Sequence, residues 1–102
     1  MFEDLLKEDC KQYRELAKRY LQVSTEQVVE LFEIKKKAWA LAQRWSDIQS
    51  NATKYAVENS ISKTDFSTWA YQRYRQLQLM HEDSRMMWRM GEEELKRTEN
   101  IN

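Results

Sequence analysis

The residue types that carry most metal and acid–base chemistry are scarce in this 102-residue chain. His81 is the only histidine and Cys10 the only cysteine, so neither a histidine pair nor a CxxC metal motif can form. The three glutamates at 92–94 occupy consecutive helical positions, whose side chains diverge and cannot converge on one calcium ion. We therefore expect a protein without catalytic residues, metal ligands or a cofactor.

One pair of residues resembles a ribonuclease motif. Arg75 and His81 form an R-x5-H string that resembles the one in HEPN-type ribonucleases, whose helical dimers place such a pair at a cleft. The resemblance covers these two residues, and five intervening residues put them on different faces of a straight helix. We prefer to interpret His81 as an edge residue and Cys10 as a small buried hydrophobe.

The composition favours an all-α fold. With one Gly and no Pro, the chain lacks the usual residues of hairpin turns and of Gly-rich nucleotide loops. Apolar residues make up 41% of the chain and aromatic residues 12%, which is enough to form a core. The length fits one helical domain spanning 1–102.

The charge is balanced overall and locally. Seventeen Lys and Arg oppose seventeen Asp and Glu, and the segments 1–23, 24–58 and 59–102 are each neutral, which argues against a strongly basic polyanion-binding domain. No apolar run approaches the ~20 residues of a membrane span, and the first residues lack the pattern of a secretory signal. Together with the single cysteine, this predicts a cytoplasmic protein that does not enter membranes.

Helical periodicity predicts three helices, at 2–22, 25–59 and 64–97, with a frayed tail at 98–102. Ser24 and Gln27 have the spacing of a capping box that begins the second helix, and Ser62 or Thr64 can cap the third. Short connections force neighbouring helices to run antiparallel. The prediction is a three-helix bundle, a short N-terminal helix plus a long antiparallel helical hairpin, completed by self-association or by a partner.

Apolar residues on the second helix alternate at spacings of three and four, which is the heptad pattern of a coiled coil. The members of this seam are Leu31, Ile34, Ala38, Leu41, Trp45, Ile48, Ala52 and Tyr55. A second row, Val28, Phe32, Trp39 and Ala42, widens the apolar arc. We therefore place the third helix on the seam, through a face that includes Phe66, Leu77 and Leu95, and the first helix on the side of Phe32 and Trp39.

Three residues, Arg73, Ser84 and Gly91, lie inside the apolar arc of the third helix, where Leu or Ile would be expected. Gly91 costs about 0.8–1 kcal/mol relative to Ala in a helix interior, which predicts a close backbone approach or a local bend there. Arg73 either extends past its stem to water or pairs with an acid of a partner chain, so we count it with the seam as a residue of the interface core.

Leu79, Met86 and Met90 form an apolar strip opposite the main face of the third helix, where they cannot reach the core. We expect this apolar strip and Arg75 to contact a partner, with Tyr71 and Arg89 at the rim. The predicted function is a non-catalytic protein–protein interaction module, such as a small bacterial or phage regulator, adaptor or inhibitor. It would dock on a larger protein, form a homodimer, or do both. A secretion-type chaperone or an assembly subunit is an alternative.

Nucleic-acid binding is another alternative, because bases and rings alternate in two segments. These are Lys35, Lys36, Lys37, Trp39, Arg44 and Trp45 in the first, and Trp69, Tyr71, Arg73, Tyr74 and Arg75 in the second. Against this, we place Trp39, Trp45, Trp69 and Tyr74 on packing faces. Tyr71 would then be the one exposed ring near the cations Arg75, Arg85 and Arg89.

Overall fold

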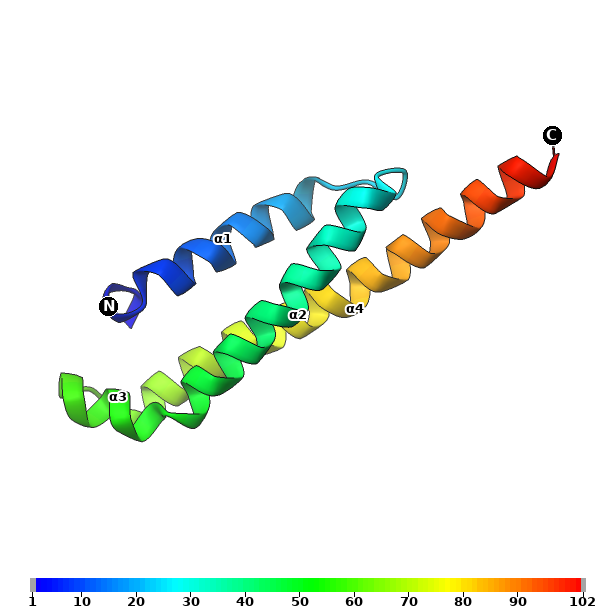
Figure 1. Ribbon diagram of the computed structural model, residues 1–102. Coiled ribbons are helices and arrows are strands. Elements are labelled where there is room, and N and C mark those ends of the chain that lie inside the picture. Colours follow the sequence, from blue (N-terminus) through cyan, green and yellow to red (C-terminus); the bar gives the residue numbers. More distant parts are fainter. Residues whose placement is uncertain (1, 102) are drawn as a thin grey trace.

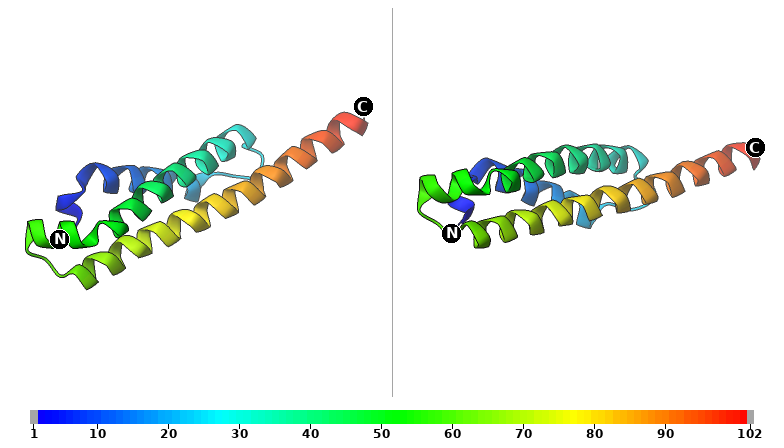
Figure 2. Two further views of the ribbon diagram at one scale, coloured as in Figure 1. Left: turned by 60° about the horizontal axis from the view of Figure 1, so that its bottom comes forward. Right: turned by 90° about the horizontal axis from the view of Figure 1, so that it is seen from below.

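A computed structural model describes residues 2–101 of the chain and the side chains of residues 2–99. Its elements are a short 3-10 helix, η1 (Phe2–Leu5), and four α-helices, α1 (Lys7–Gln22), α2 (Val28–Ser50), α3 (Ala52–Asn59) and α4 (Lys63–Ile101). The predicted all-α hairpin is confirmed: α2 and α4 pack side by side in opposite directions, and α1 lies along them (Figure 1). The described part of the chain measures 64 × 18 × 15 Å, and its elongated shape is clear in Figure 2.

The first predicted helix is interrupted near its start, so the range 2–22 was wrong in one respect. At Leu6 the backbone leaves helical geometry (φ −136°, ψ 51°), and this residue separates η1 from α1. The bend turns the N-terminus toward α4, where the Phe2 ring lies 5.6 Å from Phe66 and 5.5 Å from Trp69. The free energy gained by burying the Phe2 and Leu6 side chains therefore exceeds the cost of interrupting the helix.

The second helix begins at Val28, three residues later than the predicted start. Gln27 does reach back to the backbone N–H of Ser24 (2.9 Å), but the Ser24 hydroxyl donates to the side chains of Gln27 and Glu26. The hydroxyl is thus not the acceptor that a capping box requires. The two residues close a turn, in which the Gln27 N–H bonds to the Ser24 carbonyl (3.1 Å), and the helix follows it.

The predicted continuous helix 25–59 is broken at Asn51 into α2 and α3. The Asn51 side-chain amide donates to the Asp47 carbonyl (2.8 Å), and the Ser50 hydroxyl donates to the Ser46 carbonyl (3.0 Å). Side chains that bond to nearby carbonyls compete with the helical hydrogen bonds. The backbone of Asn51 accordingly leaves the helical region (φ −101°, ψ 20°).

The second connection lies where it was predicted, between the helices expected to end at residue 59 and to begin at residue 64. Ser60 ends α3 in the left-handed conformation (φ 54°, ψ 47°), with its N–H bonded to the Ala56 carbonyl. Of the two predicted caps, Ser62 is the one that caps α4, because its hydroxyl accepts a hydrogen bond from the N–H of Asp65 (3.2 Å). Two helix ends with satisfied backbone groups thus make the sharp reversal between α3 and α4.

The frayed tail predicted at 98–102 was wrong through Ile101, because α4 continues as a helix to that residue. Thr98 donates its hydroxyl to the Glu94 carbonyl (3.0 Å), a bond compatible with helix. Asn102 lies outside the described residues. Past Gly91, α4 extends beyond the first turn of α2 and projects from the bundle (Figure 1).

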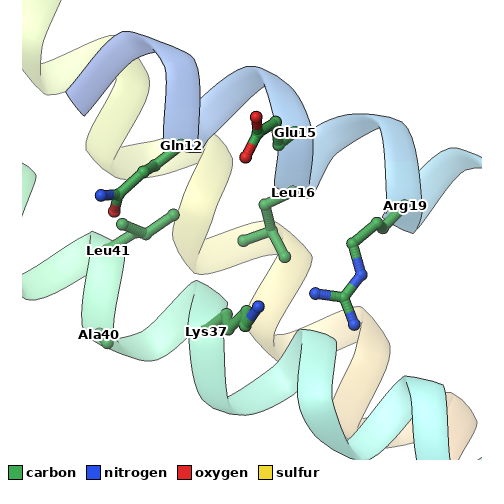
Figure 3. Close-up of a pocket in the computed structure, with 7 residues that line it drawn as sticks. All are labelled: Gln12, Glu15, Leu16, Arg19, Lys37, Ala40 and Leu41. Carbon is green, nitrogen blue, oxygen red and sulfur yellow. The ribbon is translucent and has the colours of Figure 1, made fainter. Parts of the chain in front are cut away.

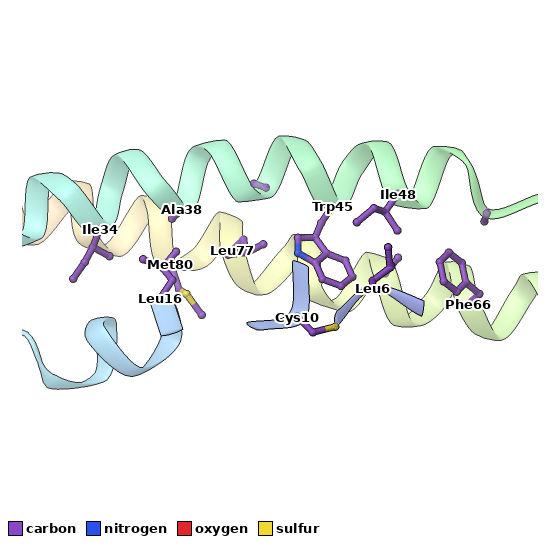
Figure 4. Packing of buried hydrophobic residues seen from close by; sticks show 13 residues of the cluster. Leu6, Cys10, Leu16, Ile34, Ala38, Trp45, Ile48, Phe66, Leu77 and Met80 are labelled. Carbon is purple, nitrogen blue, oxygen red and sulfur yellow. The ribbon is translucent and has the colours of Figure 1, made fainter. Parts of the chain in front are cut away.

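The core fills the space between α2 and α4 and is closed on one side by α1 (Figure 4). Its fully buried large side chains are Leu31, Ile34, Trp45 and Ile48 of the predicted seam, with Phe66 and Leu77 from α4. The small polar Ser84 of α4 is fully buried as well. Leu41 and Tyr55 are half-buried at the edge of this cluster. Most of the seam thus packs within the chain itself.

The first helix lies on the side of the hairpin opposite to the predicted one. Leu16 of α1 and Leu41 of α2 line the crease between the two helices (Figure 3). Arg19 pairs with Glu30, and Arg44 pairs with Asp9 at 2.9 Å, which ties α1 to this side. Periodicity alone did not distinguish the two sides, because the burial of Leu6, Cys10 and Leu16 and these charged pairs all depend on residues far apart in the chain.

Candidate functional site

The three residues considered for catalysis, Arg75, His81 and Cys10, have separate surroundings. His81 contacts the Lys35 carbonyl through Nδ1 (3.1 Å), whereas Arg75 is exposed and donates to Gln78 (2.7 Å). Cys10 is 2% exposed, and its burial raises the pKa of the thiol. Within the described residues, no three His, Cys, Asp or Glu side chains are grouped to hold a metal ion.

The apolar strip of Leu79, Met86 and Met90 lies on the exposed outer face of α4. These side chains are 48%, 63% and 57% exposed. Tyr71, Arg75 and Arg89, predicted to flank the strip, are exposed as well. Large apolar side chains exposed in a row on one helix are a common feature of protein contact surfaces.

A groove that the sequence did not reveal adjoins the strip. It occupies about 360 Å³ between the projecting part of α4 and the turn before α2. The groove is lined by Thr25, Glu26, Val28, Met90, Gly91, Glu94, Leu95 and Thr98. Leu95 was expected to face helix two, but it is 52% exposed because α2 begins too late to reach it. Met90 belongs both to the apolar strip and to this end groove.

Arg73 has its partner within the same chain. Its guanidinium lies 3.5 Å from Glu3, 4.7 Å from the centre of the Tyr13 ring and 5.7 Å from that of Trp69. The structure thus places Arg73 beneath the N-terminal segment, with Glu3 as its intrachain partner. Stacking on two rings compensates for its partial desolvation.

Four rings line the side of the hairpin that α1 leaves open. Phe32 is 37% and Trp39 is 54% exposed, although both were expected beneath the first helix. Phe32 packs against Trp88 (ring centroids 5.5 Å apart, planes tilted by 48°) and Trp39 packs against His81 (5.1 Å, 47°), so each pair joins α2 to α4. We call these four residues the ring face. The second apolar row of α2 indicated this face in the sequence, but we assigned that row to packing against the first helix.

Cations accompany the ring face. The Lys35 ammonium lies 4.8 Å from the Phe32 ring and 4.7 Å from the Trp88 ring, and that of Lys36 lies 5.4 Å from Phe32. A shallow hollow of about 430 Å³ is lined by Lys35, Lys36, Trp39 and His81. Other cations of the predicted basic segments do not join it, since Arg44 pairs with Asp9 and Arg73 with Glu3.

Comparison of the chain with protein-family models, curated proteins and solved structures finds no significant match. Within residues 2–101, each helix is too short or too polar to cross a membrane.

Proposed function

We propose that this protein is a non-catalytic protein–protein interaction module that docks through the outer face of α4. The observation that carries the proposal is the exposure of the apolar strip, Leu79, Met86 and Met90. Burial of such side chains contributes about 1.5–3 kcal/mol each. Methionine suits a contact surface because its flexible thioether adapts to the shape of a partner.

The occupant that the charges favour is a second copy, with its α4 antiparallel to the first and the two-fold axis at Met90. Arg89 of one copy then lies near Glu93 of the other, and Glu82 lies near Lys96. At about 100° per residue these four residues lie within about 60° of one another around the helix, on one flank of the strip. A two-fold axis brings this flank of one copy against the same flank of the other copy. Opposite charges then meet and set the register of the two helices.

The proposal includes a role as a small regulator, adaptor or inhibitor in the cytoplasm. A larger protein with an apolar helix or groove is the second type of occupant, because the same strip and the end groove would accept it. The two occupants differ in one respect: a second copy binds in the purified protein, whereas a larger partner must be supplied.

The mass in solution tests the proposal. Light scattering on the purified protein is expected to give twice the 12.5 kDa of one chain. Met86→Asp is expected to return the mass to one chain with helicity unchanged, because in this register its carboxylate would face Glu94 of the second copy. Val57→Asp on α3 is the matched control, since Val57 is equally accessible and lies far from the strip.

A single-chain mass for the natural protein would contradict the second copy as occupant. Affinity capture from the native host, compared between the natural protein and Met86→Asp, then tests the larger partner. Captured proteins that are the same for both would contradict docking through α4 altogether.

A further inference from the structure

The ring face has a repeat that packing alone does not require. Phe32 and Trp39 are seven residues apart on α2, and His81 and Trp88 are seven apart on α4. The two ring pairs are therefore separated by two helical turns, about 10 Å along the hairpin. Lys35 and Lys36 lie between them on α2. Along the side of the hairpin that α1 leaves open, the two lysines therefore lie between the two ring pairs.

The charge of this face differs from the neutrality of the whole chain. The residues lining its hollow are Lys35, Lys36, Trp39 and His81, so the lining holds cations and rings and no acid. On α4, the exposed Arg85 lies between His81 and Trp88 in the chain. Glu92 follows Trp88 by one helical turn and makes that end of the face acidic. The cationic stretch is therefore confined to the two ring pairs.

We propose that the ring face binds single-stranded nucleic acid. Trp39 is 54% exposed and offers a stacking surface to an unpaired base. Lys35 and Lys36 lie over the Phe32 and Trp88 rings, so a base that stacks on Phe32 would displace their ammonium groups toward the phosphates, which the exposed Arg85 would also contact. An acidic peptide would satisfy the cations but would leave the repeated ring faces without planar partners. A duplex would hide its bases, so single strands are preferred. This face is distinct from the apolar strip, and the inference does not depend on the proposed docking.

The test is fluorescence anisotropy of a labelled oligothymidylate of about 16 nucleotides, titrated with the full chain. Binding is expected to exceed that of a duplex of equal length, and to weaken steeply as salt rises from about 50 to about 200 mM. Trp39→Ala is expected to raise Kd at least about fivefold, because one stacking partner is lost. The fluorescence of Trp39 should be quenched on binding.

A charge-matched pair of variants separates a site from general attraction. Lys36→Glu and Lys18→Glu change the net charge equally, but Lys18 is an exposed residue of α1, on the opposite side of the hairpin. Lys36→Glu should weaken binding much more than Lys18→Glu. Failure to bind, equal effects of the two variants, or equal competition by oligoglutamate would each overturn the inference. Circular dichroism verifies that each variant is folded.

Discussion

Gly91 of α4 lies directly against the carbonyl oxygen of Thr25. A β-carbon at Gly91 would stand 2.7 Å from this oxygen and 2.9 Å from the Cγ2 of Val28. The close backbone approach, which was one of two explanations expected for a glycine inside this helix, is therefore what the structure shows. The contact fixes where the turn before α2 crosses α4 and where the projecting end of α4 begins.

Gly91→Ala should lower the free energy of unfolding by about 1 kcal/mol, although alanine is the better helix former. The methyl group must displace the backbone of Thr25, and this cost outweighs the gain in helix propensity. In a domain of this size, the melting temperature should fall by about 4–8 °C. A rise in melting temperature, measured by circular dichroism, would show that the turn does not lie against Gly91.

Trp45 and Trp39 should differ strongly in their contributions to stability. Trp45 is fully buried, so Trp45→Ala should cost about 3–5 kcal/mol. Trp39 is more than half exposed, so Trp39→Ala should cost less than about 1 kcal/mol. Urea denaturation measures both. Equal losses would mean that α1 covers Trp39, as the apolar pattern alone suggested.

Tyr20 should make stability depend on pH in the alkaline range. Its hydroxyl donates to Asp83 of α4, and this bond raises the pKa of Tyr20 to about 12. Unfolded tyrosine ionises near its ordinary value of 10, so the stabilisation is complete below pH 10 and is lost as pH rises toward 12. Tyr20→Phe should therefore lose less stability between pH 8 and 11 than the natural protein. Parallel losses in the two proteins would contradict the bond.

Cys10 should react with a thiol reagent only when the chain opens. Burial is the main cause of its raised pKa, so both access and thiolate formation are suppressed in the folded state. Labelling by a disulfide reagent should be at least about 100-fold slower than in denaturant. As a control, Val57→Cys in a Cys10→Ala background should label rapidly. Rapid labelling of natural Cys10 would contradict its place in the core.

The hairpin was predictable because it is a local property. Heptad spacing, the absence of Gly and Pro from residues 1–90, and serines near the second connection each act within a few residues of the chain. They also indicated which side chains of α2 meet α4, such as Leu31 and Ile34, and that the apolar strip faces away from the hairpin. Local rules failed at Asn51, where one side-chain amide bonds back to the preceding turn.

The side occupied by α1 was not predictable, because it depends on contacts between residues far apart in sequence. Arg44 with Asp9, and Tyr20 with Asp83, join segments that a periodic pattern cannot relate. The same error hid the ring face, since Phe32 and Trp39 were assigned to packing. The end groove was missed for a related reason: it exists only because α2 starts at Val28 and leaves Leu95 uncovered.

Disulfide trapping at Met90 tests the central claim most directly. A residue on a two-fold axis meets its own counterpart, so Met90→Cys in a Cys10→Ala background should oxidise to a covalent dimer of twice 12.5 kDa. Val57→Cys in the same background should remain largely monomeric. If Met90→Cys forms no more dimer than Val57→Cys at equal concentration, the outer face of α4 does not bind a second copy as proposed.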